Sequence, residues 1–373
     1  MQYTQLSRRS AGGKIDWEKQ YLTFIPVENA VFKWTQNAVG GHLEYSINGG
    51  QTWVTIANGK STPTITAGSK VIWRGNLEPS SSYGIGTFSA SGNYNAYGNI
   101  MSLLYYDNYY NNQLDSTKHK YAFYNLFKSD THLLSAPLLT STTLVDGCYK
   151  SMFMDCKSLI AAPKLPATTL ADKCYFYMFR SCTSLTTAPE LPATTLTNYC
   201  YANMFNGCTS LTTAPELPAT TLADKCYSNM FDGCINLVTA PKVLPATTLA
   251  NSCYYSMFSG CTSLTTAPEL PATTLANYCY YSMFSGCTSL VTAPELPATD
   301  LIGDNCYSKM FYGCTKLNYI KALFKTTPSR MQTGEWVSGV AATGIFVKNS
   351  AATWETIGVD GIPTGWTVIT DNS

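Results

Sequence analysis

The sequence predicts a solenoid of stacked coils, each built from one short helix and one short strand, with an all-β region before it and an atypical segment after it. Two observations carry this prediction. A frame of two cysteines eight residues apart around a Met-Phe pair, as in "CYSNMFDGC" (226–234), occurs seven times. The frames recur every 26 or 27 residues. Such a period is typical of repeats that cover their apolar sides with their neighbours.

Each repeat begins with residues that favour a helix start. Asp or Asn stands two residues before every first cysteine, where its side chain can accept hydrogen bonds from the amides of a first helical turn. Five of the seven repeats have Gly directly before the second cysteine, which favours a left-handed helix end. We therefore predict a two-turn helix in each coil, with the first Cys, the Met and the Phe on one side. A Thr-rich stretch stopped by Pro predicts the strand.

Changes in composition and in the repeat pattern along the chain predict four segments. Residues 1–16 form an N-terminal arm, and residues 17–115 form an all-β domain of sandwich or jelly-roll type, with short aromatic and β-branched runs between Gly, Asn and Ser. Residues 116–325 form the solenoid, with one divergent coil that has Ala122 and Asp130 at the cysteine positions, followed by seven cysteine-containing coils. Residues 326–373 lose the period and form a C-terminal β cap over the last open face.

The fourteen cysteines allow three interpretations. Structural zinc usually takes ligands two to four residues apart, often with His, whereas the spacing here is eight and no His lies in the seven coils. Disulfides within a frame are disfavoured because a helix would hold the two Cα atoms about 10 Å apart. A ladder of disulfides between coils stays open. We favour free thiols that act as small buried apolar residues, with no metal.

A tyrosine follows every first cysteine and predicts a ladder along the coils. Because the neighbouring cysteine faces inward on a helix, these side chains are expected at the coil edge or outside. They form a candidate ligand-contact strip for a sugar or a protein partner. The alternative is that the rings stack on each other and cover the coil edge. The strip consists of Tyr149, Tyr175, Tyr201, Tyr227, Tyr254, Tyr280 and Tyr307.

The repeat frame resembles a known family. Its pattern, apolar-x-x-x-(Ala or Met)-Phe-x-x-Cys-x-x-Leu followed by a Pro-terminated strand, is similar to the BspA-type bacterial leucine-rich repeat over about residues 120 to 320. Here Cys replaces the usual aliphatic residue, Met replaces Ala, and the coil is longer. The resemblance implies a leucine-rich-repeat solenoid and a bacterial surface protein involved in adhesion. Similar arrays occur in proteins of gut phages.

Composition excludes several classes of function. Only 13% of the residues are charged and the net charge is +1, so no basic field is present to hold nucleic acid. The sequence has no run of 18 apolar residues, so it predicts no membrane span. The start has no apolar stretch of the kind found in a signal peptide. No motif predicts a catalytic residue or a cofactor. "SINGGQTW" (46–53) resembles the Asp-box hairpin of sialidase propellers, which is a structural turn.

We therefore expect a non-enzymatic binding and structural protein. The first hypothesis is a phage virion fibre, tail or capsid-attached protein whose solenoid recognises a host-surface glycan or protein. The alternative is a bacterial cell-surface adhesin, and the remote alternative is a glycan-active enzyme. The expected location is the virion surface or the bacterial cell surface. The all-β domain would contact other virion or cell-surface subunits, with a homo-oligomer as one option.

Overall fold

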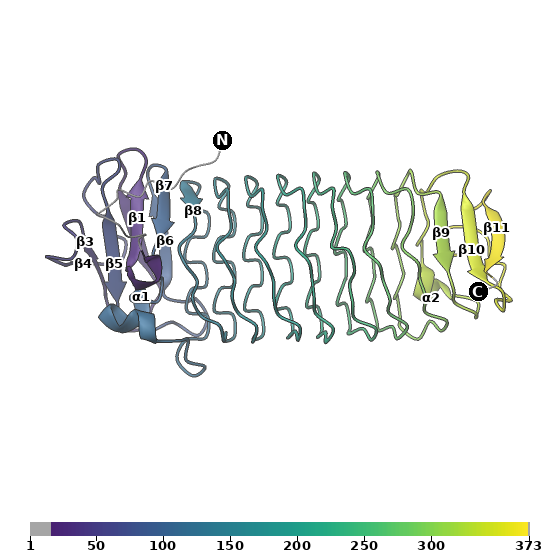
Figure 1. The fold of residues 1–373 in the computed structure, drawn as a ribbon, viewed down its shortest axis with the longest axis horizontal. Helices are drawn as coiled ribbons and strands as arrows, with labels where there is room; N and C mark the ends of the chain where they lie inside the picture. Colours follow the sequence, from purple (N-terminus) through teal and green to yellow (C-terminus); the bar gives the residue numbers. More distant parts are fainter. Residues whose placement is uncertain (1–15, 372–373) are drawn as a thin grey trace.

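The computed structural model describes residues 16–371. A β-rich region lies at one end, a row of coils follows along the long axis, and a second β-rich region lies at the other end (Figure 1). The predicted N-terminal arm, residues 1–16, lies outside the described residues apart from Asp16.

The N-terminal region is mainly antiparallel β structure. Its elements are η1 (Trp17–Lys19), β1 (Leu22–Pro26), β2 (Phe32–Gln36), β3 (Leu43–Ser46), β4 (Val54–Ile56), β5 (Val71–Gly75), β6 (Gly86–Ala90), β7 (Tyr94–Tyr97), α1 (Ser102–Tyr105) and η2 (Tyr106–Asn111). One sheet has the order β4-β3-β5-β1-β7-β8, where β8 is Leu133–Ser135, and β2 pairs with β6 in a separate ribbon. The short runs of β-branched and aromatic residues therefore form strands, as the sequence predicts.

The ribbon packs on one side of the larger sheet. The ring of Phe24 on β1 lies 5.2 Å from that of Phe32 on β2 and 5.0 Å from that of Phe88 on β6, measured between centroids. Trp73 on β5 completes the cluster, and all four rings are buried. Two facing sheets thus enclose an aromatic core. Their assignment to a sandwich or jelly-roll type stays a prediction.

The "SINGGQTW" segment forms a tight turn between β3 and β4. The Asn48 side-chain oxygen accepts hydrogen bonds from the Ser46 hydroxyl (2.8 Å) and the Thr52 amide (3.0 Å). The Ser46 hydroxyl in turn accepts from the Gly50 amide (2.9 Å). These contacts hold the turn together.

The sheet of the N-terminal region continues into the coils. Strand β8 (Leu133–Ser135) pairs in parallel with β7, with Tyr94 opposite Leu133. The divergent coil also bonds to the next one as the later coils do, because the Phe127 amide donates to the Met152 carbonyl at 2.9 Å. The predicted boundary at residue 115 therefore does not interrupt the sheet.

The cysteine-framed segments are consecutive β-turns, and the predicted two-turn helices are wrong. In one coil the Cys174 amide donates to the Ala171 carbonyl (3.2 Å), whereas the Tyr175 amide donates to the Cys200 carbonyl of the next coil (3.0 Å). Alternate amides continue this pattern along the segment. A helix would direct its amides to carbonyls four residues back. Here half of them join neighbouring coils instead.

The expected helix caps also have a different role. The Asp172 carboxylate accepts a hydrogen bond from the Asn198 backbone amide of the next coil (3.0 Å), and Asp224 accepts from Asn251 in the same way (3.1 Å). The Asp and Asn side chains thus link coils rather than cap helices. Gly207 is left-handed, with φ +72°, as the sequence predicts, but it ends a β-turn and not a helix.

The turns place residues in alternating pairs. Residues 174–175 and 178–179 are buried, whereas 176–177 and 180–181 are partly exposed. Left-handed residues recur every fourth position, at Lys173, Tyr177 and Ser181, with φ between 58° and 60°. Two residues therefore point inward and the next two outward, which differs from the 3.6-residue period of a helix.

The predicted strands of the coils are reduced to single parallel bridges, such as Thr213 to Thr239 and Thr239 to Thr266. Regular strands return at β9 (Tyr319–Ala322), β10 (Ile345–Asn349) and β11 (Thr367–Asp371), which form a parallel sheet. The short helix α2 (Arg330–Thr333) lies between β9 and β10 in the chain. The Phe311 amide donates to the Trp336 carbonyl at 2.8 Å. Backbone hydrogen bonds of the kind that join neighbouring coils therefore continue beyond the last sequence repeat. The cap itself stays a prediction.

All fourteen cysteines are buried free thiols. The second cysteine of each frame donates a hydrogen bond to a Phe carbonyl of the preceding coil, as Cys182 does to Phe153 and Cys208 does to Phe179, each at 3.0 Å. Burial raises the pKa of the Cys200 and Cys234 thiols to about 12. These thiols are therefore protonated and packed as apolar groups at neutral pH.

We expect the native thiols to be protected from a disulfide reagent such as Ellman's reagent. Their thiolate fraction at pH 8 is at least a hundredfold below that of an ordinary cysteine, and the side chains are enclosed. Release of thiolate should be slow in buffer and should reach fourteen groups in denaturant. Rapid reaction of several thiols in the native protein, or a clear shortfall in denaturant, would contradict this interpretation of the cysteines.

Candidate functional site

The structure buries the predicted tyrosine strip. Its seven side chains are only 1–2% exposed, so their expected place at the coil edge or outside is wrong. The cause is the paired turn geometry, which turns each Tyr inward together with the preceding Cys. The rings stack on each other, for example Tyr175 on Tyr201 and Tyr201 on Tyr227, with centroids 5.7 Å apart. Burial also raises the pKa of their hydroxyls. They offer no surface to a ligand.

The coils differ from one another at their outward positions. The inward Cys, Tyr, Met, Phe and Leu are the same in all seven frames, but the residue before the first Cys and the pair after its Tyr vary from coil to coil. An active or binding site needs a unique set of side chains, so the variable outward positions are the better place to look for one. The residues at these positions include Lys150, Lys173, Phe176, Tyr177, Tyr199, Lys225, Tyr255, Tyr278, Tyr281 and Lys309.

Several of these outward residues are in a conformation that does not suit them. Tyr177, Tyr199 and Tyr278 are left-handed, with φ between 56° and 60°. This conformation costs a bulky residue about 1–2 kcal/mol, whereas Asn tolerates it better. Equivalent positions of other coils hold Asn203 and Asn305, with φ of 55° and 53°. The equivalent positions of the remaining coils are left-handed too and hold Lys, Ser, Gly or Asn, as at Lys173, Lys225 and Ser252, so the conformation belongs to the turns of every coil. A large ring at such a position costs stability that Asn would not cost.

The first group of outward residues is the basic cluster. It combines aromatic rings with ammonium and guanidinium groups from the divergent coil to the fourth coil of the array. Its members are Tyr121, Tyr124, Lys150, Lys173, Phe176, Tyr177, Arg180, Tyr199 and Lys225.

Lys150 lies among three rings of the basic cluster. Its Nζ is 4.9 Å from the ring centroid of Tyr124, 5.9 Å from that of Tyr121 and 5.7 Å from that of Phe176. The ring faces attract the cation and hold it in place. Within residues 16–371 no carboxylate forms an ion pair with Lys150, Lys173 or Lys225. Their charges are therefore positioned but not neutralised.

Tyr199 lies between two lysines of neighbouring coils. The Nζ atoms of Lys173 and Lys225 are 5.6 and 5.3 Å from its ring centroid. The ring also lies edge-on to Phe176, at 5.9 Å between centroids. Tyr199 is half-buried and Lys225 is exposed, so a ligand can reach both.

Arg180, also in the basic cluster, takes part in a chain of polar contacts. Its guanidinium lies 5.2 Å from the ring of Tyr177, and its Nε donates to the Asn206 side-chain oxygen at 3.3 Å. Asn206 donates onward to the Asp232 carboxylate at 3.0 Å. Burial raises the pKa of Asp232, which hydrogen bonds and Arg180 partly oppose. The arrangement fixes Arg180 beside the rings.

A second group, the tyrosine cluster, lies further along the same outward positions. The rings of Tyr255 and Tyr281 stack with centroids 4.9 Å apart and planes 9° apart, and Tyr278 contacts Tyr281 at 5.8 Å. Tyr278 is 41% exposed. Lys309 forms an ion pair with Glu335 at 3.4 Å. Its pKa is raised, chiefly by Tyr281. This cluster consists of Tyr255, Tyr278, Tyr281, Lys309 and Tyr312.

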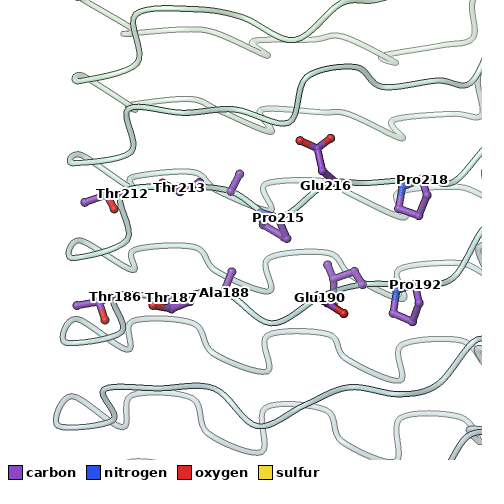
Figure 2. Close-up of a pocket in the computed structure, with 12 residues that line it drawn as sticks. Thr186, Thr187, Ala188, Glu190, Pro192, Thr212, Thr213, Pro215, Glu216 and Pro218 are labelled. Carbon is purple, nitrogen blue, oxygen red and sulfur yellow. The ribbon is translucent and has the colours of Figure 1, made fainter. Parts of the chain in front are cut away.

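A shallow groove of about 640 Å³ lies elsewhere on the coils, between the runs 186–192 and 212–218. Figure 2 shows the two runs side by side, with Glu190 and Glu216 in equivalent places. The parallel bridges of this face join Thr213 to Thr239, but none joins the two described runs that border the groove. Both runs have the same sequence, "TTAPELP". The groove therefore lacks the variation that distinguishes the two clusters.

The chemistry of the clusters suits binding. Their rings provide faces for stacking and their lysines provide hydrogen-bond donors with charge. Within the described part of the chain, no three His, Cys, Asp or Glu side chains gather as metal ligands. The search of residues 16–371 also finds no helix that is both long and apolar enough to span a bilayer. The sequence does carry a signal for the clusters, since they occupy the positions where otherwise identical repeats differ.

Comparisons with known proteins return two solved structures. No family model and no curated protein matches the chain. A leucine-rich repeat protein from Bacteroides ovatus is 17% identical, with 69% of this chain and 83% of that chain covered and a TM-score of 0.23. A leucine-rich cell surface protein from Faecalibacterium prausnitzii is 19% identical, with 59% and 71% covered and a TM-score of 0.23. Both neighbours are leucine-rich repeat proteins. At this TM-score they support no inference about what the present chain binds, and the BspA-type assignment stays a prediction.

Proposed function

We propose that this protein is a non-enzymatic recognition protein that binds a surface carbohydrate through the outward face of its coils. The observation that carries the proposal is the set of tyrosines kept in left-handed backbone conformations beside unpaired lysines. The left-handed backbone belongs to the turns of every coil, but a bulky Tyr at such a position costs more stability than the Asn that other coils carry, and this supports a role for the rings beyond folding. The nine side chains of the basic cluster stack and donate hydrogen bonds. They contain no nucleophile with an adjacent base.

Carbohydrate is the class of ligand that fits these side chains best. The negative face of an aromatic ring attracts the polarised C–H bonds on the flat side of a sugar ring. Hydroxyl groups accept hydrogen bonds from lysine and arginine. The clusters are open at the surface and not enclosed, which suits a polymer or a cell coat better than a small metabolite.

The test uses variants whose new residues already occur in the array. Tyr177→Asn with Tyr199→Asn places Asn where equivalent coils have Asn203 and Asn305. Intact protein is screened on a glycan array, and affinity for the strongest binder is then measured by calorimetry. We expect the double variant to bind at least tenfold more weakly, about 1.4 kcal/mol. We also expect its unfolding midpoint to be unchanged or higher, because Asn relieves the left-handed strain.

The matched control is Glu190→Gln in the groove, which should leave affinity unchanged. If Glu190→Gln weakens binding and the tyrosine variants do not, the groove is the site and the proposal for the outward face is overturned. A double variant that binds normally but is destabilised by 2 kcal/mol or more would show that the rings only pack. An array with no binding above background would contradict carbohydrate recognition.

We further propose that recognition takes place at a surface, either of a phage virion or of a bacterial cell. The N-terminal region supports this arrangement because its sheet is continuous with the coils through β7 and β8, so that it can mount the solenoid rigidly. Flanking capsid or tail genes would favour the virion. Flanking genes for cell-envelope proteins would favour the adhesin.

A further inference from the structure

The two clusters together define the ligand more narrowly, an inference that rests on the proposed function. We propose that the ligand is an acidic polysaccharide, carboxylated or sulfated, that lies along the solenoid axis with its anionic groups on the basic cluster and its neighbouring sugars on the tyrosine cluster.

The charge of Lys150 in the basic cluster is available to a ligand. Lys150 is held by three rings and has no carboxylate partner among the described residues. A ring face attracts an ammonium group but leaves its charge and its N–H donors available. An anion that approaches Lys150 therefore gains a charge-assisted hydrogen bond without breaking an existing ion pair. A neutral sugar would leave this charge unused.

Two ammonium groups lie close to the ring of Tyr199. Lys173 and Lys225 come from different coils and lie on the same ring, at 5.6 and 5.3 Å from its centroid. An anionic group above Tyr199 meets both ammonium groups, while a sugar attached to it can stack on the ring. Arg180, restrained by Asn206 at 3.3 Å, adds a third cation from the coil of Tyr177.

Two stacking rings, one from each cluster, lie far apart along the coils. Phe176 and Tyr255 occupy equivalent positions three coils apart. Equivalent tyrosine rings of these coils are 5.7, 5.7 and 5.8 Å apart, so the two positions are separated by about 17 Å. A single sugar cannot contact both of these rings. An extended chain can, and contact with two sites increases affinity through effective concentration.

Small, uncharged side chains lie on the surface between Phe176 and Tyr255. In the two intervening coils the residues before the first cysteine, Tyr199 and Lys225, belong to the basic cluster, whereas the outward pairs after the frame tyrosine are Ala202 with Asn203 and Ser228 with Asn229. The side chains of these pairs are small and uncharged, so they leave a path along the surface and still provide hydrogen bonds to hydroxyl groups. The tyrosine cluster at the far end has its lysine paired with Glu335. It therefore favours the neutral part of a chain.

The experiment compares acidic polymers with their neutralised forms. The probes are polygalacturonate, alginate and hyaluronate, each with its carboxyl-reduced form, and chondroitin sulfate with its desulfated form. Binding to intact protein is measured by calorimetry at two NaCl concentrations. We expect at least one acidic polymer to bind tenfold or more tightly than its neutral form. Added salt should weaken that binding, and affinity should rise with oligomer length until both clusters are spanned.

Two variants locate the effect. Lys150→Ser introduces the residue that equivalent coils have as Ser228 and Ser308, and it should weaken binding of the acidic polymer three- to tenfold while the neutral form is unaffected. Tyr281→Ser should weaken the binding of long oligomers and leave the binding of short oligomers unchanged.

The outcomes separate the two proposals. If neutral forms bind as well as acidic ones, the acidic ligand is overturned while carbohydrate recognition stands. If no polysaccharide binds, in its acidic or its neutral form, both proposals fail, and a protein partner found at the same residues would replace them.

Discussion

Raising the pH from 8 to 10 is expected to unfold this protein cooperatively. The reason is the set of fourteen buried thiols. Burial raises the pKa of Cys148, Cys200, Cys234, Cys279, Cys306 and Cys314 from 9.0 to about 12, and it raises the pKa of the other cysteines as well.

The direction follows from proton binding. Above pH 9 the unfolded chain releases its thiol protons, whereas the folded chain keeps them to a higher pH, which is about 12 for thiols such as Cys148 and Cys200. The unfolded state then binds fewer protons, so stability falls as the pH rises and is complete only below pH 9. Summed over the six thiols whose pKa is raised to about 12, the loss is roughly 2 kcal/mol at pH 9 and roughly 8 kcal/mol at pH 10, and the other buried thiols act in the same direction. Typical domains have only about 5–15 kcal/mol in total.

The measurement is the urea midpoint, followed by circular dichroism, between pH 7 and pH 10 under reducing conditions. As a control, Cys200→Ala, Cys226→Ala and Cys253→Ala together remove three of fourteen thiols and should reduce the pH slope of the unfolding free energy by about one fifth. A midpoint that does not change between pH 8 and pH 10 would contradict the burial of the thiols.

Replacing Phe205 by Ala is expected to cost about 3–5 kcal/mol of unfolding free energy. Phe205 is fully buried and stacks between Phe179 and Phe231, with centroids 5.7 and 5.5 Å apart. Truncation removes ring contacts to two neighbouring coils and leaves a cavity that rigid stacking cannot close. Because each coil contacts only its neighbours, the array should also lose cooperativity and unfold in two steps.

Chemical denaturation with a fluorescence readout tests this second expectation. Tyr278→Asn is the matched control, since Tyr278 is 41% exposed and left-handed with φ 56°. It should change stability by less than about 1 kcal/mol. A cost below 1 kcal/mol for Phe205→Ala would mean that the stack contributes little and that the coils are held by their backbone hydrogen bonds.

Part of the candidate site could have been predicted from the repeats. Lys150, Phe176 and Tyr199 stand at positions that vary between coils, while Cys, Met and Phe do not change. What sequence reasoning missed is which variable side chains meet. Lys173 and Lys225 are 52 residues apart and lie on one ring only because the coils stack in register. The strain at Tyr199 also requires a φ value, which no residue pattern reveals.

The sequence by itself determined the repeat, its register and the apolar identity of its core, because a 26-residue period of Cys, Met, Phe and Leu is only satisfied when coils stack. It also determined the left-handed glycines. Only the tertiary structure decided between helix and turn. Asp172 and Gly207 satisfy local requirements for either, and the choice depends on whether amides such as that of Tyr175 find carbonyls in their own segment or in the next coil. That choice turned the tyrosine strip inward and placed the lysines and tyrosines of the two clusters at the surface.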